Sequence, residues 1–297
     1  MMCRLIFNIT CCFYLMMTCT LNAAAADDEQ KSFLFGGTMK GLRNHSKLDV
    51  EINFSATMSK LAEEYGLEIN LRIYPTTADL KTAIQKGEIY GVFSSPLEYL
   101  ALQTLQIPKL AVQSIGMPLK KSVLVIVRKE SKPKSLLDFK GKRLALFDAQ
   151  DVEEVYLNTL LLKNKQVEIG QFFSKRTTPK NINVALMDVF FKRADMTVVR
   201  ENEFLIATEL NPQLAKQLTV LYKSPSYILW VFTGNKDNKN FNPQIIDMIL
   251  NLQSSSAGRG FLQKVNAEKF VRITHQDLQE VQELVDEYEH LSKEVAK

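Results

Sequence analysis

The residue types that most often carry catalysis are scarce in this chain of 297 residues. Its three histidines are His45, His275 and His290, and none lies at metal-binding spacing from a second histidine or a carboxylate. It contains no G-x-S-x-G, H-E-x-x-H, Walker A or dinucleotide-binding motif. Glu153 and Glu154 are adjacent, so on a helix they point in different directions and cannot act as a pair. We therefore expect no enzyme activity, no catalytic residue, no metal and no cofactor.

Hydroxyl and carboxylate side chains stand where two helices are expected to begin. Ser94 and Ser95 precede Pro96, which suits the first turn of a helix, and capping would use one hydroxyl and leave the other free. The second helix start, residues 148–154, reads DAQDVEE. Its carboxylates satisfy the free N–H groups and interact favourably with the positive end of the helix dipole. Because an incoming anion would need the same N–H groups, the second start is expected to disfavour an anionic ligand.

The elements around these residues follow an alternating pattern. Expected strands are 33–35, 67–74, 90–93, 123–127, 144–147, 196–199 and 228–232. Expected helices are 50–65, 78–86, 96–105, 152–164, 182–193 and 202–209. Repeated strand–helix–strand order predicts an α/β fold with largely parallel sheets.

Two segments interrupt this order and suggest a hinge. Each leads into an apolar strand: the first is GMP at residues 116–118, and the second is YKSPSY at residues 222–227. The roughly hundred residues between them are enough for a domain. The helices after Pro243 accompany no new strand, so we expect them to return to the first domain. The last helix, from Gln276 to about Glu294, has one apolar stripe. The stripe indicates packing on its own domain, with docking to a partner as the alternative.

The first 26 residues have the pattern of an export signal. Arg4 is followed by an apolar run from Leu5 to Leu21 and then by small residues at 23–26. The run is somewhat short for a membrane-spanning helix of about 20 residues, and a retained anchor is the alternative. All four cysteines lie within this segment: Cys3, Cys11, Cys12 and Cys19. We expect cleavage near Ala24 to Ala26, a mature protein without disulfides, and a location in the periplasm of a Gram-negative bacterium.

Composition excludes several other classes of protein. The chain is 46% hydrophobic and 24% charged, which is ordinary for a globular protein and argues against disorder. Lysine and arginine total 37 against 33 aspartates and glutamates, a net charge of +4 without runs of like charge. No nucleic-acid partner is therefore expected.

Three segments resemble one protein family. Residues 77–100, TADLKTAIQKGEIYGVFSSPLEYL, are similar to a helix, a strand and a Ser/Gly-Pro-x-x-Tyr turn of the phosphonate-type periplasmic substrate-binding proteins of ABC transporters. Residues 135–147, SLLDFKGKRLALF, resemble the stretch that opens the second domain of those proteins, and residues 184–199, VALMDVFFKRADMTVV, resemble a later helix and strand. The resemblance implies an α/β, two-lobed type II periplasmic binding protein fold with two crossover strands.

The resemblance also implies where lobes and ligand lie. Lobe one would comprise residues 27–118 and 227–297, and lobe two residues 119–226, after a signal peptide at 1–26. A ligand in such a fold lies at the carboxyl ends of strands and the amino ends of helices. The candidate ligand-binding residues there are Thr38, Met39, Tyr74, Ser94, Ser95, Tyr99, Asp148, Gln150, Asp151, Arg176, Arg200 and Tyr227.

One departure from the family concerns the phosphoryl subsite. Relatives carry a Ser/Thr-rich turn where this chain has the acidic residues 148–154. At about 5 Å and an effective dielectric of about 20, a carboxylate repels each unit of ligand charge by about 3 kcal/mol. Either the ligand is cationic or neutral, or cations such as Lys175, Arg176 and Arg200 offset the acid.

Aromatic residues offer a further alternative. Phe35, Tyr74, Tyr99 and Tyr227 would suit an apolar ligand if they lined the cleft. The single tryptophan, Trp230, lies beside the second crossover, where hinge packing and ligand stacking are both open.

The resulting functional prediction is a monomeric, exported receptor that delivers a small molecule to an ABC transporter permease. Its phosphoryl subsite would be altered and acidic. The alternatives are a sensory or scaffolding module that signals to a membrane kinase, and a carrier of an apolar, lipid-like ligand.

Overall fold

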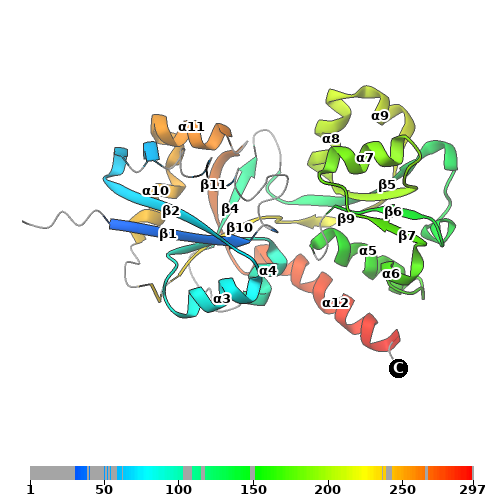
Figure 1. The fold of residues 1–297 in the computed structure, drawn as a ribbon, viewed down its shortest axis with the longest axis horizontal. Helices are drawn as coiled ribbons and strands as arrows, with labels where there is room; N and C mark the ends of the chain where they lie inside the picture. The colour runs from blue at the N-terminus through cyan, green and yellow to red at the C-terminus, as the bar shows by residue number, and fades with distance from the viewer. Residues whose placement is uncertain are drawn as a thin grey trace, which may run out of the picture.

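Two β-sheets covered by helices form the two lobes of the protein (Figure 1). The computed structural model describes residues 31–38, 40, 50, 52, 54, 59–61, 63–102, 109–114, 118–147, 151–235, 237–238, 243–264 and 267–295. The expected export signal lies outside these residues. Among the described residues, no helix has the length and apolar character needed to cross a membrane.

The first lobe has a six-stranded sheet in the order β11-β4-β10-β3-β1-β2. Its strands are β1 (Lys31–Thr38), β2 (Leu67–Tyr74), β3 (Gly91–Ser94), β4 (Lys109–Ser114), β10 (Val231–Gly234) and β11 (Ala267–Ile273). Its helices are α3 (Thr77–Gln85), α4 (Pro96–Leu102), α10 (Pro243–Leu250) and α11 (Ser256–Lys264). Helix α3 packs closely on β1 at Gly36. A Cβ atom added to Gly36 would lie 3.0 Å from the side chain of Leu80 in α3 and 2.7 Å from that of Ile89. Gly36 therefore serves helix–sheet packing.

The second lobe has a five-stranded sheet in the order β7-β6-β8-β5-β9. Its strands are β5 (Lys121–Arg128), β6 (Arg143–Ala145), β7 (Lys175–Thr177), β8 (Met196–Arg200) and β9 (Leu218–Tyr227). Its helices are α5 (Val152–Lys163), α6 (Ile169–Phe172), α7 (Ile182–Phe190), α8 (Glu201–Leu210) and α9 (Pro212–Gln217). Two apolar clusters cover the faces of this sheet, one built on α5 and the other on α7.

The expectation of largely parallel sheets is wrong. Strand β1 pairs in parallel with β2 and β3, and β6 pairs in parallel with β7 and β8. The other strand pairs are antiparallel: β3–β10, β4–β10, β4–β11, β5–β8 and β5–β9. The antiparallel pairs involve the strands by which the chain enters and leaves each lobe, and a strand that returns from the other lobe needs no helical crossover.

The helices that follow residue 243 divide between the lobes. Helices α10 and α11 pack in the first lobe, as expected, through Ile246, Ile249 and Leu262. The last helix, α12 (Gln279–Val295), instead packs mainly on α5 of the second lobe. Its stripe residues Val281 and Leu284 complete the apolar cluster around α5, which explains why the helix leaves the lobe that precedes it.

Candidate functional site

The carboxyl ends of three strands in the first lobe meet at one edge of the sheet. Strand β1 ends at Thr38, directly beside Tyr74 at the end of β2, and β3 ends at Ser94. Helices α3 and α4 begin immediately after β2 and β3. This is the edge at which α/β proteins of this kind bind ligands.

Glu98 in the first turn of α4 joins the polar groups of that edge. Its Oε1 accepts hydrogen bonds from the hydroxyls of Thr38 at 2.5 Å and Thr77 at 3.1 Å. Its Oε2 accepts the backbone N–H of Ser95 at 3.3 Å, and its own N–H donates to the Ser95 hydroxyl at 3.2 Å. The last two bonds form a capping box, and its S-x-x-E signature is present in the sequence as a signal for Glu98 that our predictions did not include. Glu98 is 4% exposed, so the carboxylate fastens β1, α3 and α4 together.

Both candidate serines are used inside the protein. Ser95 is occupied in the capping box with Glu98. The Ser94 hydroxyl donates to the carbonyl oxygen of Val231 at 3.4 Å across the sheet, so the expectation that one of the two hydroxyls remains free is wrong. Both serines are almost fully buried.

The candidate aromatic residues lie in separate apolar clusters. Phe35 and Tyr74 belong to clusters on opposite faces of the first sheet, Tyr99 packs near the start of α12, and Tyr227 is buried between the second sheet and α12. Burial and the negative charges of Glu287 and Glu280 raise the pKa of Tyr227 to about 12, despite a hydrogen bond with Ser224.

Tyr74 and Trp230 each add one detail. The Tyr74 hydroxyl is buried and has no hydrogen-bond partner in the part of the chain that the structure describes. Trp230 stacks on Phe93 at a ring distance of 5.1 Å and contacts Phe270, which agrees with packing beside the hinge.

The corresponding edge of the second lobe carries buried charges. Asp151 caps α5, with its Oδ1 accepting the N–H of Val152 at 2.8 Å. Arg200, at the end of β8, donates from Nη2 to Asp151 Oδ2 and from Nε to Glu153 Oε1, both at 2.9 Å. The two carboxylates are 1% exposed and the arginine side chain 14%. Two of the predicted residues therefore come together with Glu153 in one buried cluster.

The other predicted cation at this edge is also paired. Arg176 in β7 forms a bidentate ion pair with Glu154, with N–O distances of 2.7 and 2.9 Å. Glu153 and Glu154 therefore bind different arginines, as their adjacent positions on a helix require. Lys175, the neighbour of Arg176, is exposed.

A second cation lies near Arg200. Burial and the positive charge of Arg200 lower the pKa of Lys121, at the start of β5. Lys121 is therefore a second positive group beside Arg200, while Arg200 itself pairs with the two buried carboxylates. Sequence analysis missed Lys121 because only the antiparallel pairing of β5 and β8 brings it near Arg200.

Three predicted site residues, Met39, Asp148 and Gln150, lie outside the described residues. Within the described ranges, no group of three or more histidine, cysteine, aspartate or glutamate side chains could hold a metal ion. Several hydrogen bonds of the described candidates gather in two clusters, one around Glu98 in the first lobe and one around Arg200 in the second.

Comparison with solved structures supports the two-lobed fold. The model is similar to a binding protein component of an ABC phosphonate transporter from Pseudomonas aeruginosa, with 14% identity and a TM-score of 0.67 over 90% of this chain and 89% of that chain. PhnD1 from Prochlorococcus marinus in complex with methylphosphonate is 16% identical, with a TM-score of 0.62 over 86% and 97% of the two chains. The periplasmic aliphatic sulphonate binding protein of Escherichia coli is 13% identical, with a TM-score of 0.53 over 90% and 94%. These likenesses confirm the predicted type II periplasmic binding protein fold.

Comparison of sequences identifies the family. No curated protein sequence matches the chain. The family model described as the periplasmic substrate-binding protein of phosphonate ABC transporters matches residues 44–278, which confirms the predicted resemblance. The chain belongs to the phosphonate-binding family of periplasmic substrate-binding proteins of ABC transporters.

Proposed function

We propose that this protein is an exported receptor that binds a small ligand between its lobes for an ABC transporter permease, and that its phosphoryl subsite is altered. Family membership supports the role of receptor. The alteration is supported chiefly by one observation: Asp151 and Glu153 occupy the start of α5 together with Arg200. The family resemblance implies hydroxyl residues there, whereas in this chain a phosphonate would compete with the chain's own carboxylates.

The charges around Arg200 refine the argument from sequence. Counted alone, Asp151 and Glu153 would repel a phosphonate dianion strongly. Arg200 pairs with both carboxylates and offsets one of their two charges, so the cluster of these three side chains keeps one negative charge. The Arg200 guanidinium already donates to both carboxylates, which leaves it poorly placed to bind a further anion. We infer that the group of the ligand next to α5 is neutral or cationic.

Calorimetry with methylphosphonate tests this proposal. We expect weak binding by the unmodified protein. The double variant Asp151→Ser, Glu153→Ser should bind at least about tenfold more tightly, because it removes two negative charges, restores hydroxyl donors and releases Arg200. Glu154→Gln is the matched control, since it breaks the neighbouring ion pair with Arg176 and leaves the Arg200 cluster intact. Micromolar or tighter binding by the unmodified protein would contradict the altered subsite.

The proposed partner is tested separately. The purified protein should stimulate the ATPase activity of its transporter in liposomes, and variants with weakened ligand binding should do so less. Stimulation of a membrane kinase instead would favour the sensory alternative. Sedimentation of the purified protein should show the expected monomer.

The proposed export is tested at the N-terminus. The protein recovered from the periplasm should begin near residues 25–27, after removal of the signal. An intact N-terminus in the membrane fraction would favour the retained anchor.

A further inference from the structure

Helix α12 is buried against both lobes. Leu278, in the 3₁₀ turn Gln276–Leu278 just before the helix, belongs to an apolar cluster of the first lobe that includes Val231 and Ile273. Val281, one helical turn later, belongs to the cluster around α5 in the second lobe. The chain therefore passes from one apolar core to the other within a single turn.

An ion pair fastens this turn to the hinge. Lys120 lies next to the start of β5, where the chain enters the second lobe, and its Nζ donates to both carboxylate oxygens of Glu280 at 2.7 Å. Their side chains are 28% and 38% exposed. The pair joins the first crossover to the first turn of α12.

Beyond its first turn, the polar contacts of α12 with other described elements reach the second lobe. Lys163 at the end of α5 pairs with Glu287 at 2.8 Å. The hydroxyls of Tyr288 and Ser292 donate to Glu168, beside α6, at 2.8 and 3.3 Å. A movement of the second lobe relative to the first therefore displaces α12 against the turn that precedes it.

Helix α12 also contacts both helices that begin at the candidate site. It packs along α5, which Asp151 caps, and touches α4, which contains Glu98. Helix α4 lies in the first lobe and α5 in the second, so a change in the angle between the lobes would move one helix relative to the other. Helix α12 would then have to slide on at least one of them.

We propose that α12 is a third connection between the lobes, a strap that sets the angle between them. The two crossovers expected for the family lead into β5 and out of β9. The strap adds a connection that is fixed along the second lobe and held at the hinge by the pair of Lys120 with Glu280. Loosening that pair broadens the range of lobe angles, whichever ligand the protein binds.

Distance measurement between spin labels tests the strap without a ligand. The labels are attached at Gln85→Cys in α3 and Gln171→Cys in α6, two exposed positions in different lobes, in the full chain with its four N-terminal cysteines replaced by serine. The test variants are Lys120→Glu, Glu280→Lys and the exchange that combines both. Asp247→Lys is the control, because it breaks an exposed ion pair with Arg272 that lies within the first lobe and does not involve α12.

We expect each single variant to lower the ratio of the population at the main interlobe distance to the population at all other distances by about two- to fivefold. This is the change in an equilibrium that the loss of a partly exposed ion pair produces. The exchange should restore the distribution, and Asp247→Lys should leave it unchanged. Circular dichroism shows that each variant is folded, and the neutral pair Lys120→Gln, Glu280→Gln replaces any that is not. Unchanged distributions in the hinge variants, or equal broadening by Asp247→Lys, would overturn the proposal. Because no ligand is used, failure here is distinct from failure of the proposed function.

Discussion

Strand β8 has a charged cluster at each end, and the two clusters differ in their ratio of arginines to carboxylates. Before the strand, the carboxylate of Asp195 is shared by Arg143 and Arg128. At its end, the guanidinium of Arg200 is shared by Asp151 and Glu153. The first cluster has an excess of arginine and lies away from the candidate site, whereas the second has an excess of carboxylate and lies within it.

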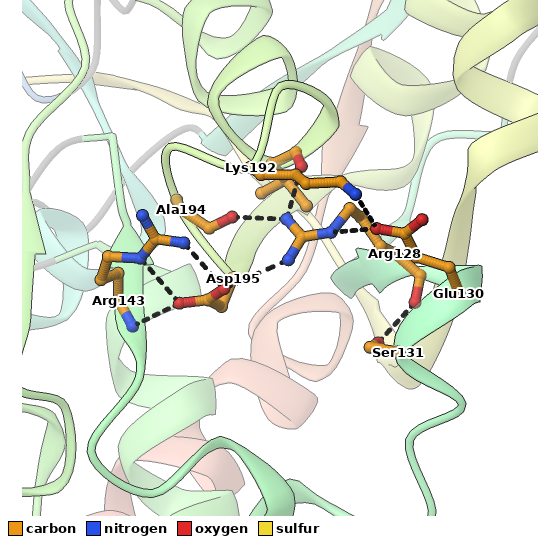
Figure 2. Close-up of polar contacts among 8 residues, drawn as sticks. Arg128, Glu130, Ser131, Arg143, Lys192, Ala194 and Asp195 are labelled. Atoms are coloured by element: carbon orange, nitrogen blue, oxygen red, sulfur yellow. Dashed lines mark hydrogen bonds and ion pairs between the residues drawn. The ribbon is translucent and has the colours of Figure 1, made fainter.

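The Asp195 cluster acts as a structural clamp (Figure 2). Arg143 donates to both oxygens of Asp195 at 2.9 and 3.0 Å, and its backbone N–H donates at 3.0 Å. Arg128 adds a bond at 3.2 Å and also donates to the carbonyls of Val189 and Ala194. These bonds tie together β5, β6 and the turn that leads into β8.

The Arg200 cluster is harder to explain by stability alone. Its two carboxylates are 1% exposed, so folding removes them and a guanidinium from water, and burial of ions often costs as much as their attraction returns. A helix start can be capped by one aspartate or serine, without a second carboxylate and an arginine. The contrast supports a role for this cluster in setting the charge that a ligand meets.

The largest effect is expected from Arg200→Gln, which leaves two buried carboxylates without their guanidinium. We expect it to lower the free energy of unfolding in urea by about 3–5 kcal/mol. Adding Asp151→Asn and Glu153→Gln should recover most of the loss. Arg176→Gln, which affects the more exposed pair with Glu154, is the control and should cost clearly less. Equal losses in the two arginine variants would remove the contrast between buried and exposed pairs.

A smaller loss, about 2–3 kcal/mol, is expected from Asp195→Asn at the other end of the strand. It removes the carboxylate from two arginines, but Arg128 keeps its two carbonyl partners and Arg143 reaches solvent. The control is Glu130→Gln, at an exposed carboxylate that pairs with Lys192 and Arg128, and it should change stability by less than about 0.5 kcal/mol. A loss greater than that of Arg200→Gln would reverse the proposed ranking of the clusters.

Glu98 extends the comparison to the first lobe. Glu98→Gln should lower the free energy of unfolding by about 1–2 kcal/mol, because an amide keeps one acceptor oxygen and sets an NH₂ group against a donor. The control is Asp79→Asn, in the exposed pairing with Thr76 at the start of α3, where about 0.5 kcal/mol or less is expected. No difference between the two variants would mean that burial of Glu98 adds nothing to ordinary capping.

Sequence patterns predicted a strand well where apolar and polar residues alternate regularly, and a helix well where a capping residue marks its start. Strand β2 has the predicted bounds, and α5 begins at the predicted residue after its acidic cap. Strands β4, β7, β9 and β11 were not predicted. Strand β7 has three residues, and β11 alternates only weakly between buried and exposed positions. The segment 222–227, expected as a break, continues β9, because Pro225 lies on an edge strand where its missing N–H is tolerated.

The candidate site was predictable in its residue types and not in its pairings. The positions of Asp151 and Arg200 at a helix start and a strand end follow from the pattern of elements. Their contact depends on the parallel pairing of β6 with β8 across about 50 residues, which no local pattern encodes. The same holds for Asp195 and its arginines, which sequence analysis did not single out. The capping box of Ser95 and Glu98 is local, and its spacing alone would have identified it.

The smallest predicted effect is the pH dependence of the Asp195 clamp. Burial alone would raise the pKa of Asp195, but the hydrogen bonds from Arg143 and Arg128 outweigh it and lower the pKa from 3.8 to about 2. Since the pKa is lower in the folded state, the clamp stabilises the protein fully above about pH 4, and the stabilisation is lost as the pH falls toward 2. The shift corresponds to at most about 2 kcal/mol, which solvent screening reduces to about 1 kcal/mol.

Urea unfolding of the unmodified protein and of Asp195→Asn between pH 6 and pH 2 measures this effect. The difference in unfolding free energy between the two proteins should stay constant down to about pH 4 and then shrink by about 1 kcal/mol, because a protonated Asp195 resembles asparagine in charge. Other carboxylates with lowered pKa values, such as Asp138 and Asp277, are present in both proteins and cancel in the difference. A difference that stays constant to pH 2 would show that the clamp depends on the geometry of the side chain and not on its charge. The contrast with the Arg200 cluster would then rest on burial alone.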